Sequence, residues 1–300
     1  MTLSTLIKRN TKMFFKDKAM FFTAMITPLI LLVLYMTFLG NVYKESFTGA
    51  LPGIPLNDEL DKLINAVVAG QLVSSLLAVC CVTVAFCSNM LMVQDKATGA
   101  RNDLNISPVK RSTLAVGYYV STLISTLIIA IIATGAGFGY IASVGWYLST
   151  SDVLFVLLDV FLLTMFGTAL SSVVNFFLSS QGQIAAVGSI VSSVYGFLCG
   201  AYMPISQFGD GLQKVLMFLP GTHATSLLRG HTMRGAFEEM RVKGFPDEVV
   251  DSMMDTVDYN IYFFGDKIPE WTKFTVLGGC VVLLIAAYVI LNMAFRQRKK

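Results

Sequence analysis

From Thr113 to Tyr140 the chain reads TLAVGYYVSTLISTLIIAIIATGAGFGY, without a single charged side chain. This stretch belongs to a run of about forty uncharged residues after Arg111, and about fifty more follow Asp159. A charge at the centre of a membrane-spanning helix costs roughly 2.5–3.5 kcal/mol on insertion scales, and a span needs about 20 apolar residues. The stretch therefore predicts a membrane-spanning helix, and further uncharged runs predict a multi-pass membrane protein.

The composition excludes an ordinary soluble domain. Charged residues make up 14% of the 300 residues, against about 25% in soluble proteins, and 55% are hydrophobic. The run after Asp159 is too long for one helix, and the polar string SSQGQ at Ser179–Gln183 divides it. We expect an all-α protein with six spans, over Ala19–Gly40, within Ala66–Val93, and over Thr113–Tyr140, Val153–Leu178, Ile184–Cys199 and Phe274–Phe295.

The basic residues orient these spans. They gather in the N-terminal segment, in the loop Asp95–Arg111 and in the tail: Lys8, Arg9, Lys12, Lys16 and Lys18, then Lys96, Arg101, Lys110 and Arg111, then Arg296, Arg298, Lys299 and Lys300. Six spans place these three segments on one face, which the positive-inside rule makes cytoplasmic. The stretch Asp210–Glu270 is acidic and belongs outside. Both termini are therefore expected in the cytoplasm.

Residues 1–18 have the pattern of a basic amphipathic helix. Five apolar residues fall on one arc, namely Leu3, Leu6, Ile7, Met13 and Phe14, and Asn10 interrupts this arc. Such a helix lies in the cytoplasmic interface of a membrane. It is either a plain anchor for the first span or a docking surface for a cytoplasmic partner.

Motifs for catalysis and cofactors are largely missing from the sequence. There is no HExxH pattern, the five cysteines lie in apolar runs without metal-ligand spacing, and no GxxxxGK[ST] loop exists to bind ATP. Glu238-Glu239-Met-Arg241 resembles the signature of intramembrane CAAX-type proteases, but the arginine spacing is wrong. Asp159 is interpreted as an interhelical or outer-interface residue, with contact to a cationic cargo as the alternative. His223 is expected to be structural.

The loop from Asp95 to Arg111 reads DKATGARNDLNISPVKR. It resembles the intracellular loop of ABC-2-type transporter permeases, although that family more often has glutamate where this chain has Asp95. The resemblance implies that residues 94–112 form an ATPase-coupling loop with a short helix near Gly99–Ser107. Its expected coupling residues are Asp95, Gly99, Arg101, Leu104, Ser107, Pro108 and Arg111.

Two other regions agree with this family. The stretches Gly200–Ser206, Leu216–His223 and Leu228–Gly230 resemble its outer re-entrant segment, and the amphipathic N-terminus resembles its interface helix. The expected outer-gate residues are Gly200, Pro204, Leu212, Pro220 and His223. Residues 19–300 would form the transmembrane domain, with an outer region at 200–271, in which Gly235–Trp271 lies outside the recognised pattern.

The resemblance implies the permease subunit of an ATP-driven exporter in a bacterial plasma membrane. Its partners would be separately encoded ATP-binding subunits, a second permease copy or homologue, and membrane lipids, with no nucleic acid. ATP and Mg²⁺ are expected on the partner, and no cofactor or metal on this chain. A drug, an antimicrobial peptide or an amphipathic, lipid-like molecule is the expected cargo. The alternatives are a membrane-embedded, protease-like enzyme and a sensor that engages an ATPase without transport.

Overall fold

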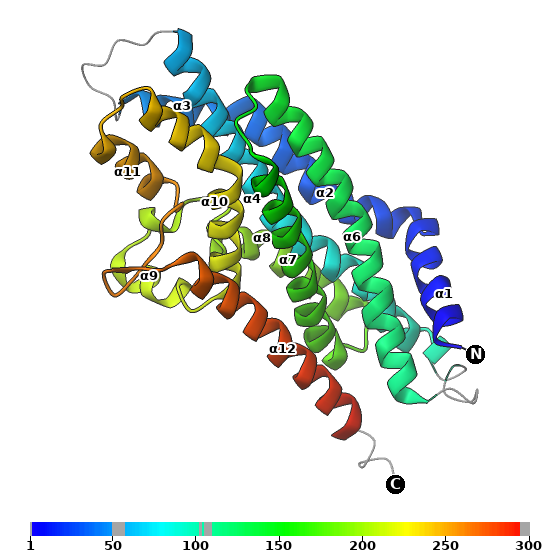
Figure 1. The fold of residues 1–300 in the computed structure, drawn as a ribbon. Helices are drawn as coiled ribbons and strands as arrows, with labels where there is room; N and C mark the ends of the chain where they lie inside the picture. Colours follow the sequence, from blue (N-terminus) through cyan, green and yellow to red (C-terminus); the bar gives the residue numbers. More distant parts are fainter. Residues whose placement is uncertain (1, 50–57, 102–103, 105–109, 295–300) are drawn as a thin grey trace.

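The computed structural model describes residues 2–49, 58–101, 104 and 110–294, which form a bundle of long helices (Figure 1). Five helices are long and apolar enough to cross a membrane, over Lys18–Glu45, Asp58–Ala97, Ser112–Val144, Thr150–Phe177 and Glu270–Ala294. They coincide with the first, second, third, fourth and sixth expected spans. The prediction of a helical, multi-pass membrane protein is therefore confirmed.

The N-terminal part of the bundle contains two helices that meet at Asp17. The amphipathic helix α1 (Leu3–Lys16) ends there, and the Asp17 Oδ1 accepts the backbone N–H of Met20 at 3.0 Å, which caps the start of α2 (Lys18–Leu34). The first span continues through a π-helical turn, η1 (Tyr35–Leu39), into α3 (Gly40–Gly49).

Helix α1 buries a narrower face than its apolar pattern predicts. Leu6, Asn10 and Phe14 are buried, whereas Leu3 and Met13 are exposed. Leu6 and Phe14 therefore pack into the protein as expected. The difference arises because the i, i+4, i+8 positions face the bundle, so that the polar Asn10 lies inside and accepts a hydrogen bond from Arg9 Nη1 at 2.8 Å.

The central helix is α4 (Asp58–Ala97), which has 40 residues. It contacts α1, α2, α3, α6, α7, α8 and α10, and 94% of its most apolar 18-residue window is buried. Three acidic residues in its first turn and Lys96 in its last suit the helix dipole. At both ends, α4 extends by these charged turns beyond the uncharged run of the second expected span.

In the described part of the chain, α4 is followed by three long helices of the bundle. They are α6 (Arg111–Val144), α7 (Thr150–Phe177) and α8 (Gln181–Leu198). The break between α7 and α8 falls in the predicted polar string, where Ser180 and Gln183 form a capping box. Gly167 allows α7 to approach α4, since a Cβ there would lie 2.9 Å from the carbonyl oxygen of Cys81 and from Val82 Cα.

Helix α8 occupies the position of the fifth expected span. It has 18 residues, or about 27 Å at 1.5 Å per residue, and it starts with the polar Gln181 and Gln183. It is not among the five helices that meet the length and apolarity of a membrane span. The total of six spans therefore stays a prediction.

The outer region is more helical than the sequence suggests. After the 3₁₀ turn η2 (Ile205–Gln207) come α9 (Asp210–Leu216), α10 (Pro220–Val242) and α11 (Asp247–Thr256). A hairpin of β1 (Tyr262–Phe263) and β2 (Asp266–Lys267) leads into α12 (Glu270–Ala294). The strands are antiparallel, with Tyr262 opposite Lys267, and Phe264 and Gly265 turn between them with positive φ.

Within the segment expected to be re-entrant, the short α9 is followed by α10, which is the main outer element. Pro220 occupies the first turn of α10, a position that suits proline. The N-terminal half of α10 is almost wholly buried against α4, α7 and α12, although its sequence is polar. The packing is close because Gly70 of α4 faces the backbone of Thr232. Re-entry of this segment into a membrane stays a prediction.

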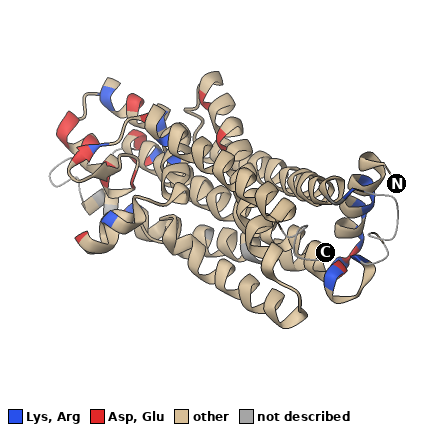
Figure 2. Ribbon diagram, turned by 90° about the horizontal axis from the view of Figure 1, so that it is seen from below, with Lys and Arg blue, Asp and Glu red and all other residues tan. Residues whose placement is uncertain are grey.

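The two ends of the bundle differ in charge (Figure 2). Lysine and arginine lie at both ends, but most of the aspartate and glutamate lies at the end opposite α1, so the end that holds α1 is basic on balance. The end of α12 lies at the basic end too, because the Tyr288 hydroxyl reaches the carbonyl oxygen of Ala115 at 3.3 Å. This separation supports the orientation predicted from the loops.

Candidate functional site

A buried ion pair joins three helices at the basic end, in the region predicted to couple to an ATPase. Asp95, near the end of α4, is 3% exposed. Its Oδ2 accepts a hydrogen bond from Arg9 Nη1 of α1 at 2.8 Å and from the Tyr118 hydroxyl of α6 at 2.5 Å, and its Oδ1 accepts from Arg9 Nη2 at 3.2 Å. The bond to Asp95 raises the pKa of the Arg9 guanidinium above its usual value. Asp95 thus faces inward and ties α1, α4 and α6 together.

Neighbouring residues fix the end of α4. Lys96 Nζ donates to the carbonyl oxygens of Asn175, Phe176 and Leu178 at 3.0, 2.7 and 2.9 Å, which attaches α4 to the end of α7. Gly99 has a φ of +81°, the left-handed conformation that ends a helix and favours glycine. The predicted Gly99 therefore starts the loop by stopping α4.

The other predicted coupling residues are placed only in part. Leu104 packs against Leu6, Met92, Leu114 and Tyr118, and so contacts α1, α4 and α6. Arg101 is half-buried, and Arg111 opens α6. Ser107 and Pro108 lie outside the described residues. Sequence reasoning missed the roles of Arg9, Lys96 and Tyr118, because no local pattern relates Arg9 to a residue 86 positions away.

At the opposite end, a second buried ion pair holds the segment after α8. Arg229 of α10 is 1% exposed. Its Nη1 donates to Asp258 Oδ2 at 3.0 Å, and its Nη2 donates to the carbonyl oxygen of Gly200 at 2.6 Å. Asp258 also accepts the backbone N–H groups of Ile205 and Ser206 at 2.5 and 3.0 Å. The predicted gate segment is therefore clamped to α10 and to the stretch that follows α11.

The five predicted gate residues have different surroundings. Gly200 has a φ of +76°, and a Cβ there would lie 2.9 Å from Ile205. Pro204 is buried, Pro220 is half-buried, and Leu212 is 47% exposed on α9. His223 is buried, its Nε2 bonds to the carbonyl oxygen of Met217 at 2.8 Å, and burial lowers its pKa. This neutral, inward-facing His223 fits the structural role expected from the sequence.

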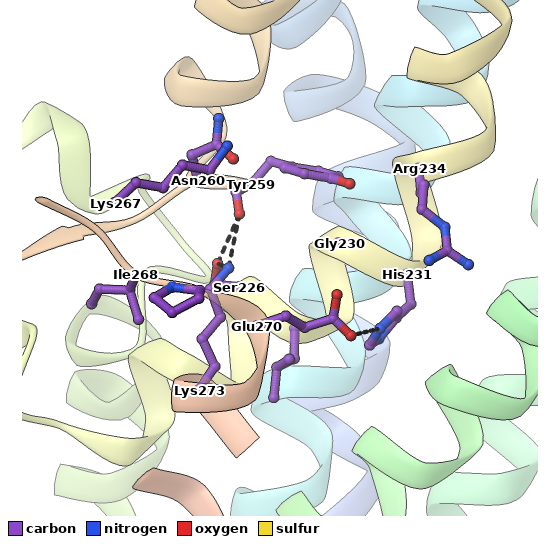
Figure 3. Close-up of a pocket in the computed structure, with 12 residues that line it drawn as sticks. Ser226, Gly230, His231, Arg234, Tyr259, Asn260, Lys267, Ile268, Glu270 and Lys273 are labelled. Carbon is purple, nitrogen blue, oxygen red and sulfur yellow. Dashed lines mark hydrogen bonds and ion pairs between the residues drawn. The ribbon is translucent and has the colours of Figure 1, made fainter. Parts of the chain in front are cut away.

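His231 lies between two carboxylates from two other helices. Figure 3 shows the contact with Glu270. The His231 Nδ1 is 2.6 Å from Asp159 Oδ2 of α7, and its Nε2 is 3.1 Å from Glu270 Oε1 of α12. The ring is stacked on Phe155 at 4.9 Å and on Phe274 at 6.1 Å. Asp159 is 1% exposed, which confirms its interpretation as an interhelical residue.

The surroundings of His231 favour its charged form. Ionised carboxylates only accept hydrogen bonds, so both ring nitrogens must carry a proton to donate to both partners. Burial lowers the pKa of His231, but the hydrogen bonds and charges of Asp159 and Glu270 outweigh it, and the net pKa is raised. We interpret His231 as an imidazolium that links α7, α10 and α12.

A polar cavity of about 150 Å³ lies beside this cluster (Figure 3). Lys273 closes its inner side and donates from Nζ to Ser226 Oγ at 2.8 Å and to the carbonyl oxygen of Tyr259 at 3.1 Å. The cavity is lined by Ser226, Leu227, Gly230, His231, Arg234, Tyr259, Asn260, Lys267, Ile268, Pro269, Glu270 and Lys273. Four of these side chains are basic and one is acidic, so the cavity suits a small polar or anionic group.

The stretch Gly235–Trp271 therefore completes the buried outer network. Asp258 and Glu270 supply the carboxylates for Arg229 and His231. The Glu238–Arg241 motif is different, since Glu238 is exposed and Arg241 binds Asp251 at 2.6 Å on the surface. This placement gives no support to the protease-like alternative. Within the ranges that the structure covers, no three His, Cys, Asp or Glu residues are grouped to hold a metal.

An apolar cavity of about 210 Å³ lies between the first three spans. It is lined by Leu32, Tyr35, Leu72, Val73, Leu76, Ala136, Gly137 and Tyr140. The Tyr35 hydroxyl at its edge donates to the carbonyl oxygen of Ala201 at 3.0 Å, which links the first span to the predicted gate segment. The cavity can accommodate an apolar group within the membrane domain.

These features define a class of protein: a multi-pass helical membrane protein with an amphipathic first helix and a basic loop between its second and third spans. The family model of the ABC-2 type transporter matches residues 1–232, and the chain belongs to this family. It is thus the membrane component of an ABC transporter, and membership implies association with an ATP-binding subunit. The match ends within α10. No curated protein matches the chain.

Proposed function

We propose that the chain is the permease subunit of an ATP-driven exporter, and that it moves an amphipathic or lipid-like molecule, a drug or a peptide out of the cell. The observation that carries this proposal is the ABC-2 match over residues 1–232. The apolar cavity between the first three spans supports a cargo with an apolar part. The chain would work as a dimer in the plasma membrane, with both termini in the cytoplasm.

The loop after α4 is the proposed contact for separately encoded ATP-binding subunits, which would hold ATP and Mg²⁺. Gly99 ends α4 at the start of this loop, and Leu104 packs against side chains of α1, α4 and α6. A push on this loop would reach α1 and α4 through the bonds among Arg9, Asp95 and Tyr118. Arg101 and Lys110 give the loop basic side chains that can pair with acidic residues of a partner.

A pull-down tests this assignment. The tagged chain is isolated in gentle detergent from its host, its partners are identified, and ATP hydrolysis is assayed. We expect a stoichiometric ATP-binding protein to be isolated with the chain. In Arg101→Ala this protein should be lost, or its ATP hydrolysis should no longer depend on the permease. Lys214→Ala, which removes one exposed positive charge on α9, is the matched control and should retain the partner. A chain isolated alone and without ATPase activity would contradict the proposal.

Direction and cargo need a second experiment. In inside-out vesicles the cytoplasmic face of the complex points to the medium, where ATP is added. An exporter should therefore accumulate a fluorescent amphiphile inside these vesicles, and only when ATP is present. Uptake in right-side-out vesicles would instead indicate an importer. Normal assembly and ATP hydrolysis without any movement of amphiphiles or peptides would favour the sensor alternative.

A further inference from the structure

A groove of about 470 Å³ lies at the basic end, between α1, the start of α2 and the end of α4. It is lined by Arg9, Lys12, Met13, Lys16, Asp17, Met20, Leu91 and Gln94. The three basic residues follow one another at spacings of three and four, so they share one side of α1. This side flanks the face that buries Leu6 and Phe14.

Among the residues that the structure describes, the positive charge of the groove is only partly neutralised. Arg9 is paired with Asp95, but Lys12 and Lys16 form no ion pair with any residue in the described ranges. Asp17 supplies the one carboxylate of the lining, and its Oδ1 accepts the Met20 N–H that starts α2. Two exposed ammonium groups are thus left to bind an anion.

The floor of the groove is apolar. Met20 and Leu91 are 7% and 5% exposed, and Met13 covers one side. Farther along α2, Phe22 and Ile26 are 61% and 50% exposed on the face turned away from Met20. The cationic groove with its apolar floor therefore lies at the start of the first span, at the level where the headgroups of a membrane would lie.

We propose that this groove binds the headgroup phosphate of an anionic phospholipid. The phosphate oxygens accept hydrogen bonds from Lys12 and Lys16. The glycerol and upper acyl chain contact the apolar floor formed by Met20 and Leu91. A free phosphate ion would satisfy only the cationic part of the groove. Since Arg9 lines the groove and holds Asp95, the lipid sits against the bond network that ties α1 to α4 and α6.

Native mass spectrometry of the purified full-length chain with 1-palmitoyl-2-oleoyl phosphatidylglycerol tests this site. The double variant Lys12→Gln/Lys16→Gln is compared with Lys8→Gln/Lys18→Gln, which removes the same charge from exposed positions of α1 and α2 outside the groove. A lysine near an anionic surface contributes about fivefold in affinity, so we expect a roughly 25-fold loss for the groove pair. The control pair should lose much less, and phosphatidylcholine should bind all forms weakly.

Three results would overturn the proposal. An equal loss in both double variants would mean a general surface attraction without a site. Complete displacement of the lipid by inorganic phosphate would mean a phosphate-ion site. Unchanged lipid binding, combined with loss of the ATP-binding subunit in Lys12→Gln/Lys16→Gln alone, would mean that the groove docks a protein.

Discussion

The strongest quantitative test concerns the ion pair of Arg9 and Asp95. A double-mutant cycle measures the coupling energy of the two side chains, which is large for a buried pair and small for a surface contact. Arg9→Ala leaves the Asp95 carboxylate, 4% exposed, with only the Tyr118 hydroxyl as its described hydrogen-bond donor. Asp95→Ala leaves the Tyr118 hydroxyl without its acceptor, while the Arg9 side chain, 25% exposed, can still reach water.

The magnitudes follow from these environments. Breaking a buried pair on one side costs about 3–5 kcal/mol, and the partial exposure of Arg9 places Arg9→Ala near the lower limit, about 3 kcal/mol. Loss of charge-assisted bonds and an unsatisfied hydroxyl give Asp95→Ala a cost of about 3 kcal/mol. The double variant cannot lose the same pair twice. We therefore expect it to cost about 4 kcal/mol, which leaves a coupling energy of about 2 kcal/mol.

The free energy of unfolding is measured by titration with sodium dodecyl sulfate in dodecyl maltoside micelles, and helix content is followed by circular dichroism. The surface pair Arg241–Asp251, whose side chains are 38% and 55% exposed, serves as the control, with an expected coupling of about 0–1 kcal/mol. If the losses in the free energy of unfolding of Arg9→Ala and Asp95→Ala add up in the double variant within about 0.5 kcal/mol, the two side chains are not coupled and the proposed ion pair is refuted. Asp95 would then act, if at all, on a partner.

Three further predictions concern the interior. Gly167→Ala should lower the free energy of unfolding by about 1–3 kcal/mol, because the new Cβ meets the backbone of α4. Gly139→Ala is the control: no atom lies within 4 Å of its new Cβ, so it should be neutral or stabilising by up to about 1 kcal/mol. Equal effects of the two changes in the same titration would contradict the close contact. Because its carboxylate partners raise the pKa of His231, the stabilisation that it gives is complete below its ordinary pKa of about 6.5 and is lost as pH rises through the raised value. The melting temperature of the protein should therefore fall with rising pH in that window, and a slope unchanged in His231→Gln would disprove this. Arg229→Met should lower the free energy of unfolding by about 3–5 kcal/mol, because it leaves the buried Asp258 without its cation. Adding Asp258→Asn should restore part of this loss. No recovery of stability in the double variant would contradict the ion pair.

The sequence predicted the membrane helices well, because the absence of charge is a local and strong signal. The polar string Ser179–Gln183 correctly predicted the break between α7 and α8. The full length of α4 was not predicted, since its ends are polar and are stabilised by contacts with other helices. The count of six spans is still open at α8.

The sites were harder to predict, for two physical reasons. The N-terminal half of α10 is buried although its sequence is polar, so its hydropathy wrongly indicates an exposed segment. Small residues such as glycine and threonine allow it to pack closely all the same. The charged pairs join residues distant in the chain, as in Arg9 with Asp95 and His231 with Asp159. Asp95 was predicted from the family resemblance as a coupling residue, which stays a prediction, and its inward direction depends on tertiary structure alone.

Helix α4 is about 60 Å long at 1.5 Å per residue, and other helices surround it on most of its length. A close-packed interior does not deform continuously, so displacing α4 would disturb its contacts with seven other helices at once. Moving a helix at the edge of the bundle disturbs fewer such interfaces, as for α8, whose main contact is α4. We therefore expect α4 to keep its place during any rearrangement of the domain, while helices with fewer contacts move.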